Sequence, residues 1–404
     1  MRATTQSTVD DALDRTGRLP FEAEAHRAEP GDGDHSVAAA TLASLPGATP
    51  PRLHALFEVF GTPARALEAV RDGRGAEALA HDRRRAHLAG LWAQTANPKA
   101  VAEALRRRGT HVFDATQIEF PIDPRLDEAP AVLFAEGDRP EVLDRPRVAI
   151  VGTRAATPPG IADARALGRY LAEQGVTVVS GLAIGIDAAA HEGALEVGGG
   201  VIGVVATGVD VVYPRRHGPL FGRVRRHGLV LGEYGFGVHP TKARFPERNR
   251  IIAALSDATV VIEATASGGA RITANCALRY GRDVLAVPGS RRNPAAAGCN
   301  ALIADGAHPL LDPSDVISIL ALASPASTYA AIEARGEGRA GWGGRPVRIS
   351  VPAGRLLAEM GGEPATLDDL VGRSGSSVGE IAGLIRELER ANRVGRLRGR
   401  IWPL

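Results

Sequence analysis

The stretch RVAIVGTR (residues 147–154) combines an apolar run with a turn that ends in an arginine, and VTVVS (176–180) repeats the apolar run. Similar short runs follow at residues 201–206, 229–232, 258–262 and 283–287, and helical patterns cover residues 159–174 and 187–197. Continuous apolar strands that alternate with helices indicate a parallel sheet covered on both faces. We therefore expect a doubly wound, mostly parallel α/β sheet that binds ligands beyond the carboxyl ends of its strands.

The segments on either side of these strands differ from them in composition and in periodicity. Residues 1–35 are polar and without apolar periodicity, and we interpret them as a disordered tail. Residues 36–100 show helical periodicity broken by Pro and Gly. The pairing of LASLPGA (42–48) with LFEVFGTP (56–63) resembles helix-hairpin-helix and sterile-alpha-motif-like modules, and we expect a domain of the latter kind; a plain helical packing domain is the alternative. The sheet domain is expected over residues 101–323, with peripheral elements in its first part. A linker is predicted at residues 324–349. A winged-helix domain is predicted at residues 350–404, because two helical stretches and a hairpin at 396–402 follow in order.

Composition restricts the partners and the compartment. The net charge is only +2, so a polyanionic ligand has to be held by local patches. Neither Cys276 nor Cys299 has a Cys or His partner at zinc-ligand spacing, so no metal site is expected. Two cysteines in 404 residues suit a reducing cytosol. No apolar signal core and no apolar run of about 20 residues is present, so we expect a soluble, cytoplasmic protein without a membrane partner.

The first two strand ends suggest an anion site rather than a dinucleotide site. The turn Gly152-Thr153-Arg154 lacks the GxGxxG spacing of dinucleotide-binding folds and places Arg154 at the strand's carboxyl end. The second strand ends in SGLAIGID (180–187), where Gly181 and Gly185 allow close backbone approach and a new helix offers free N–H groups. Ser180 adds a hydroxyl, and Asp187 is expected to cap the helix. A purely structural turn is the alternative.

The densest cationic cluster is TKARFPERNR (residues 241–250), which we interpret as a basic loop. Its cations are suited to phosphates, and Phe245 offers a ring on which a base can stack. A solvated charged loop is the alternative. Ser267 and Gly268 open another helix with exposed N–H groups, which suggests a further backbone site. The cations of the cluster are Lys242, Arg244, Arg248 and Arg250.

No catalytic constellation is recognisable. His191, Glu192 and Glu263 are the only groups near the strand ends that suggested one, and they form no Ser/His/Asp order, paired-carboxylate motif or phosphate-binding loop of the Walker type. His191 is more readily explained as a core or helix-surface residue. We therefore expect no enzyme activity and no cofactor.

Seven blocks occur in the order typical of one family: VAIVGTR, VVSGLAIGIDAAAH, GVIGVVATGVDVVYP, FPERNRIIAALSDATVVIEA, SGGARITA, GRDVLAVPG and GCNALIADGA. Over residues 126–319 the chain closely resembles the DNA-processing protein A (DprA/Smf) family. The resemblance implies an extended Rossmann-like fold, a homodimer, and single-stranded DNA binding that helps load RecA recombinase during natural transformation. It also implies a DNA-binding pocket made of Arg154, Ser180, Gly181, Gly185, Lys242, Phe245, Arg248, Asn249, Ser267 and Gly268, with Arg250 adjacent in the basic cluster.

Two other functions compete with this one. The α/β domain type also resembles nucleoside-monophosphate phosphoribohydrolases, which need a PGGxGTxxE loop with a working Glu. Here PGS (288–290) is followed by RRNP (291–294), without that Glu. A regulatory module that reads duplex DNA through the winged helix is the third option. The basic hairpin, with Arg390, Arg393, Arg396, Arg398 and Arg400, is equally compatible with DNA and with a protein partner.

Overall fold

The computed structural model describes residues 32–79, 82–323, 350–360, 365–390, 394–397 and 400–403. The chain forms two compact units, a larger one that runs to Leu310 and a smaller one that contains the C-terminal helices and hairpin. Of the tail predicted over residues 1–35, residues 1–31 lie outside the described part of the chain. The predicted linker, residues 324–349, lies wholly outside it.

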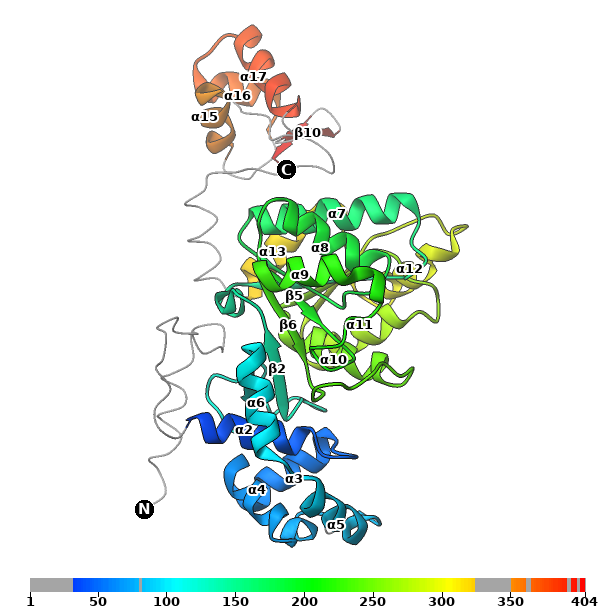
Figure 1. Ribbon diagram of the computed structural model, residues 1–404. Helices are drawn as coiled ribbons and strands as arrows, with labels where there is room; N and C mark the ends of the chain where they lie inside the picture. The colour runs from blue at the N-terminus through cyan, green and yellow to red at the C-terminus, as the bar shows by residue number, and fades with distance from the viewer. Residues whose placement is uncertain are drawn as a thin grey trace, which may run out of the picture. The chain divides into compact units, whose positions relative to one another are not determined.

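The larger unit is built on one mixed sheet of nine described strands (Figure 1). The seven strands from β6 to β9 run parallel, and β1 and β2 extend the β6 edge in antiparallel pairing. This confirms the predicted α/β fold with a mostly parallel sheet. The strands in sheet order are β1 (His111–Asp114), β2 (Val132–Glu136), β6 (Gly228–Gly232), β5 (Val201–Val204), β4 (Thr177–Ser180), β3 (Arg147–Val151), β7 (Ala258–Val261), β8 (Asp283–Ala286) and β9 (His308–Pro309).

Two layers of helices cover the sheet, as Figure 1 shows. One layer contains α7 (Pro158–Glu173), α8 (Ile186–Glu196) and α9 (Gly218–His227). The other contains α10 (Arg244–Leu255), α11 (Gly269–Arg279) and α12 (Ala297–Ala304). The chain changes layers after β6, when α10 carries it back across to β7 beside β3. The strand order therefore reverses between β3 and β7, and such a switch point is where open α/β sheets form ligand crevices.

Alternation along the strands explains why both layers are held tightly. Ala149 and Val151 of β3 pack with Ile251 and Ile252 of α10 in one apolar cluster. Their neighbours Val148 and Ile150 are equally buried but point to the opposite face of the sheet. Both faces of each central strand are thus apolar, which is the reason for the continuous apolar runs in the sequence.

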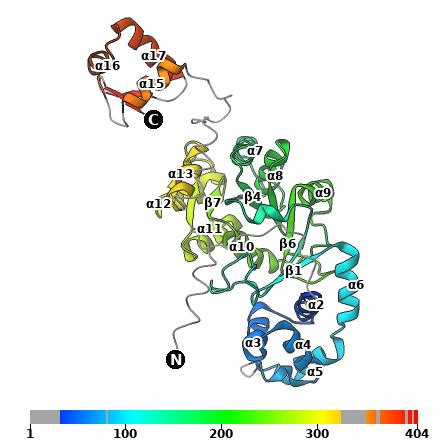
Figure 2. The ribbon, with the colours of Figure 1, turned by 90° about the vertical axis from the view of Figure 1, so that its left-hand side faces the viewer.

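Short helices precede the sheet in the larger unit (Figure 2). They are α2 (Asp32–Ala43), α3 (Pro50–Phe60), α4 (Pro63–Arg71), α5 (Arg85–Thr95) and α6 (Pro98–Arg108). Proline at the start of α3, α4 and α6 suits the first turn, where no N–H partner is needed. Helix α2 begins four residues before the expected domain start at 36. Nε2 of His35 lies 3.0 Å from a carboxylate oxygen of Asp114, and this contact ties α2 to β1.

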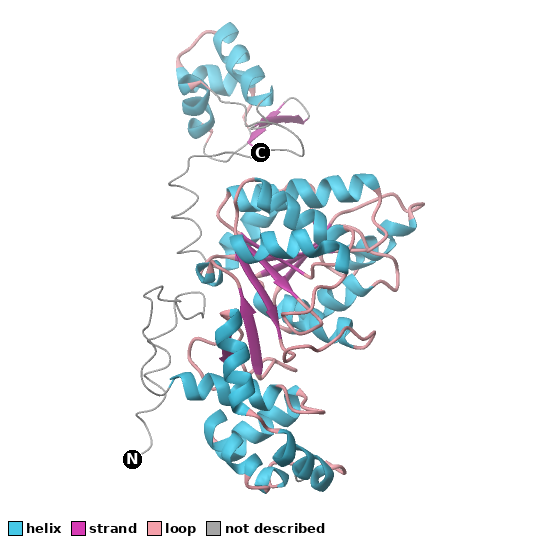
Figure 3. Cartoon of the chain, in the orientation of Figure 1, coloured by secondary structure: helices cyan, strands magenta, loops and turns pink. Residues whose placement is uncertain are grey.

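The smaller unit contains a three-helix arrangement and a hairpin, coloured by element type in Figure 3. Its elements are α15 (Val351–Glu359), α16 (Leu367–Ser374), α17 (Val378–Arg390), β10 (Val394–Leu397) and β11 (Arg400–Pro403). The sequence predicted α16, α17 and the hairpin but not α15. Thr366 and Asp369 form a reciprocal capping box at the start of α16. Arg393 and Arg398 of the predicted basic hairpin lie outside the described residues.

The remaining described helix is α13 (Ser314–Ala323). The short 3₁₀ turns are η1 (Arg74–Ala76), η2 (Pro140–Leu143), η3 (Arg215–His217) and η4 (Pro294–Ala296).

Candidate nucleic-acid interface

A cavity of about 300 Å³ lies at the sheet's switch point. The carboxyl ends of β3 and β7 and the first turns of α8, α10 and α11 line it. Neither α8, α10 nor α11 has a side-chain cap at its start. The positive ends of the three helix dipoles favour anions at this position, although the N–H groups of Ile186 and Ala188 in α8 already donate to the carbonyls of Thr153 and Ala183. The lining residues are Val151 to Arg154, Ala183, Asp187, Phe245, Pro246, Arg248, Asn249, Ile252, Ala264, Gly268 to Ala270, Ile272 and Thr273.

The basic cluster is helical rather than a loop, and this corrects the sequence interpretation. Helix α10 already begins at Arg244, so most of the segment from 241 to 250 forms its first turns. Pro246 lies within the first turn of this helix, where proline is tolerated because its missing N–H has no partner there. The helix places Phe245 and Asn249 four residues apart on one face, and both line the cavity.

Arg154 and Phe245 form the open part of the site. The Arg154 guanidinium lies over the Phe245 ring, 4.6 Å from its centroid, although the two residues come from different elements. Arg154 is exposed and Phe245 is half-buried. Asn249 is held beside them because its Nδ2 donates to the carbonyl of Gly269 (3.2 Å). A cation, a ring and an amide therefore face the same cavity.

Arg248 is buried beneath the cavity instead of being directed toward solvent. Its Nη1 donates to the carbonyl oxygen of Gly181 (2.7 Å) and to that of Val204, which joins the ends of β4 and β5. Burial lowers the pKa of Arg248 to about 10, an effect that Asp187 opposes and Arg154 reinforces. The guanidinium remains charged at neutral pH and adds positive potential to the cavity floor.

Two glycines at the end of β4 are required by neighbours within the chain. A Cβ on Gly181 would lie 2.5 Å from the Arg248 guanidinium. Gly185 has a φ of +88°, and a Cβ there would lie 2.5 Å from the carbonyl oxygen of Thr153. The sequence attributed both glycines to the approach of a ligand. In the structure they allow Arg248 and the β3 turn to approach the α8 turn closely.

Several of the predicted contact residues are not brought to the cavity. The Ser180 hydroxyl is buried and donates to the carbonyl of Ile150 (2.6 Å). Arg250 is buried in an ion pair with Glu233, 2.5 Å from Nη2 to Oε2. Lys242 and Ser267 are exposed but do not line the cavity, whereas Gly268 does.

The acidic and imidazole groups near the cavity have structural roles. The N-cap of α8 is Gly185 and not, as the sequence had suggested, Asp187. The carboxylate of Asp187 instead accepts a hydrogen bond from the Gly181 N–H (3.1 Å). Glu263 accepts from the backbone N–H (2.9 Å) and the hydroxyl (2.5 Å) of Thr157 at the start of α7. His191 is fully buried in α8, and burial lowers its pKa to about 3, so its ring is neutral. The sequence left a core and a helix-surface position open for His191, and the structure places it in the core.

One aromatic residue beside the cavity was missed. Tyr213 follows β5, and its ring centroid lies 5.6 Å from that of Phe245. The segment VVYP (211–214) was noted only as part of a family block. The available signal was an aromatic residue in the segment that follows the buried strand β5, but its contact with Phe245 joins residues that are distant in sequence.

The described helices include none with the length and apolar character that a membrane span requires. Among the described residues, no cluster of three or more His, Cys, Asp or Glu side chains is arranged to hold a metal ion.

Comparison with known proteins gives matches to both compact units. The family model described as DNA recombination-mediator protein A matches residues 115–321, and that of the DprA winged helix domain matches residues 350–400. Protein Smf of Escherichia coli is 34% identical over 305 residues, which cover 73% of this chain and 78% of the relative. The solved DNA processing protein A of Streptococcus pneumoniae superposes with a TM-score of 0.61 at 31% identity, covering 70% of this chain and 97% of that one. The solved DNA processing protein A of Helicobacter pylori, studied for its single-stranded DNA binding mode, has a TM-score of 0.47 at 31% identity. The match covers 52% of this chain and 95% of that one.

Proposed function

Because this chain belongs to the DNA recombination-mediator protein A (DprA/Smf) family of DNA-processing proteins, we propose that its switch-point cavity binds single-stranded DNA. The observation that carries the proposal is the Arg154–Phe245 pair at the mouth of an anion-attracting cavity. A cation beside an aromatic ring suits a nucleotide, since the phosphate takes the charge and the base stacks on a flat group. Paired bases in a duplex do not present a free face for such stacking.

The size of the cavity supports a nucleotide-sized occupant. About 300 Å³ is at the lower end of the range of roughly 300–1,000 Å³ found for small-molecule pockets. A duplex does not fit such a space, whereas one splayed nucleotide of a single strand does. Within this site, Arg154, Phe245, Asn249 and Gly268 are the proposed direct contacts. Arg248, Gly181 and Gly185 shape the floor, and Lys242 and Ser267 are proposed to contact the strand outside the cavity.

We propose that the chain acts as a binding protein rather than as an enzyme. The two carboxylates closest to the site, Asp187 and Glu263, are already hydrogen-bonded to backbone N–H groups of the chain. A carboxylate held in this way orders a turn, and the Thr157 hydroxyl that donates to Glu263 belongs to the N-cap of α7. Arg250 and Ser180, which face the protein interior, are proposed to support the fold of the site.

The proposal is tested with the full-length protein by fluorescence anisotropy, using labelled oligo-dT and an equal-length duplex. Wild type is expected to prefer the single strand, and Arg154→Ala/Lys242→Ala to bind it at least about 10-fold more weakly. The salt dependence of log K is expected to flatten by about 0.7 for each phosphate contact that is lost. Arg65→Ala/Lys99→Ala removes the same charge from exposed positions in the N-terminal helices and serves as the control. Equal binding of duplex and single strand, or an unchanged double variant, would reject the assignment.

The partners of the complex are part of the same proposal. We propose that the protein forms a homodimer in the cytoplasm and helps load RecA recombinase onto single-stranded DNA during natural transformation, as the family relationship implies. Sedimentation equilibrium is expected to give twice the mass of 42.2 kDa. RecA filaments are expected to form faster on single-stranded DNA when the protein is present. A monomer at all concentrations would contradict the homodimer, and an unchanged rate of RecA filament formation would contradict the role in RecA loading.

A further inference from the structure

Tyr213 is an aromatic side chain left open to solvent on the sheet edge that carries the cavity. It lies nine residues beyond the end of β5, which neighbours β4 and β6 in the sheet, and 43% of its surface is exposed. Among the described residues it is the only aromatic one with a comparable exposure. It does not line the cavity, so its ring is available beyond the cavity wall. Large exposed rings are suited to contacts with a flat, half-apolar partner.

Tyr213 continues a row of flat side chains that begins in the cavity. The Arg154 guanidinium lies 4.6 Å from the Phe245 ring centroid, and the Tyr213 ring lies 5.6 Å from Phe245 on a plane tilted by 46°. Arg154 and Phe245 line the cavity, whereas Tyr213 lies outside it. The row therefore leads outward, and successive unpaired bases need such successive flat surfaces.

Two cations follow the ring directly. Arg215 and Arg216 open the turn η3 (Arg215–His217), and both are exposed. Neither makes an ion pair with another residue in the described part of the chain. Cations next to an exposed ring supply the phosphate contact that a stacked nucleotide requires.

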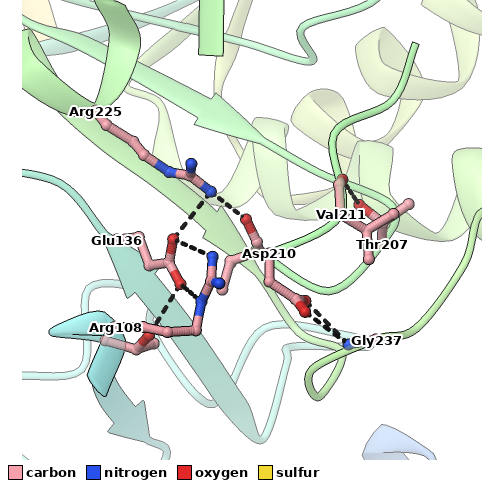
Figure 4. A network of polar contacts seen from close by, with 9 residues as sticks. Arg108, Glu136, Thr207, Asp210, Val211, Arg225 and Gly237 are labelled. Atoms are coloured by element: carbon pink, nitrogen blue, oxygen red, sulfur yellow. Dashed lines mark hydrogen bonds and ion pairs between the residues drawn. The ribbon is translucent and has the colours of Figure 1, made fainter. Parts of the chain in front are cut away.

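The segment that leads to Tyr213 is held in place by a polar network, shown in Figure 4. Arg225 donates to the carbonyl of Val209 (2.6 Å) and pairs with Glu136 (2.9 Å), which also binds Arg108 (2.6 Å). Asp210 accepts the Gly237 N–H (3.0 Å). Val209 is thus tied to α9 and Asp210 to the segment that follows β6, so less conformational entropy is lost when a ligand binds to the ring that follows.

We propose that Tyr213, Arg215 and Arg216 form a second nucleotide position, next to the cavity, on the path of the single strand. The base of this nucleotide stacks on Tyr213, and its phosphate is bound by the two arginines. The proposal rests on the function proposed above and adds a position to it. The proposal also implies that the single-stranded DNA runs from the cavity across Phe245 toward η3.

The test is anisotropy on a ladder of oligo-dT lengths with full-length wild type, Tyr213→Leu and Tyr213→Phe. Tyr213→Leu is expected to bind the longer oligonucleotides about 5- to 150-fold more weakly, the range for one stacking contact. Its affinity for the shortest oligonucleotides, which fill only the cavity, stays at the wild-type value. Tyr213→Phe keeps the ring and the affinity. Arg215→Ala/Arg216→Ala flattens the slope of log K against log salt by about 0.7, because one phosphate contact is lost.

The outcomes separate the two proposals. If Tyr213→Leu binds every length as wild type does, while Phe245→Ala binds all of them weakly, the second position is rejected and the cavity remains. If neither variant changes binding, both proposals fail. Thermal unfolding of each variant shows whether the chain is folded, and the exposed position of Tyr213 predicts little change in stability.

Discussion

Replacing Phe245 with alanine is expected to weaken the binding of single-stranded oligonucleotides by about 5- to 150-fold, which corresponds to one stacking contact of about 1–3 kcal/mol. The ring is half-buried in the first turn of α10, lines the cavity and lies against Arg154. Its loss removes a flat surface for the base and also frees the Arg154 side chain, which must then be ordered at the moment of binding. Equilibrium anisotropy with labelled oligo-dT measures the change.

The chain offers a matched control for this variant. Phe60 at the end of α3 is also half-buried and also lies beneath a guanidinium, that of Arg74, at 5.9 Å. Phe60→Ala therefore removes an equivalent Arg–Phe contact in the N-terminal helices and is expected to leave DNA binding unchanged. Phe245→Leu keeps the apolar volume without the ring and is expected to behave like Phe245→Ala, whereas Phe245→Tyr binds normally. If Phe245→Leu binds as tightly as wild type, stacking is not the role of this residue.

The strands were predictable because their signal is local. Val148 to Val151 are apolar at every position since both faces of β3 are covered, and the observed strand ends at Val151, directly before the predicted turn at Gly152. The same reasoning placed α7 and α8 within one residue at each end. The start of α10 was missed for an equally local reason. Lys, Arg and Pro over residues 242–248 are typical of a loop, and only the packing of the following apolar turns shows that the helix begins at Arg244.

The site was only partly predictable because its decisive contacts are not local. Gly181 and Arg248 are 67 positions apart, and no sequence pattern indicates that one accommodates the other. Charge alone cannot distinguish Arg154, which is exposed at the cavity, from Arg250, which is buried against Glu233. Counting cations in a segment therefore identifies the right region of the fold but not which cation is free to bind a phosphate.

Replacing Arg250 with methionine is expected to destabilise the protein by about 3–5 kcal/mol, because it leaves the Glu233 carboxylate buried without its cation. The pair is almost completely shielded from water, with 8% and 4% of the Arg250 and Glu233 side chains exposed. Replacing both residues with methionine removes the pair without leaving a buried charge. This double variant is expected to be close to wild type in stability. Urea denaturation followed by circular dichroism measures both.

The single variant is also expected to depend on pH in a defined direction. Burial raises the pKa of Glu233, and Arg250 opposes that effect. Without Arg250 the pKa rises further, so the folded state binds a proton more readily than the unfolded state. Stability of Arg250→Met relative to wild type should then increase as the pH falls toward the ordinary Glu pKa of about 4.3. The double variant lacks the carboxylate and should not show this recovery.

The same double variant decides whether Arg250 contacts DNA, as the sequence suggested, or only supports the fold. Both side chains of the pair face each other inside the protein, so a folded double variant is expected to bind oligo-dT with wild-type affinity and an unchanged salt dependence. A folded double variant that binds at least about 10-fold more weakly, with a flatter salt dependence, would show that Arg250 does leave Glu233 to bind a phosphate. In that case the buried ion pair is a resting state of the free protein, and DNA binding must be accompanied by a rearrangement of α10.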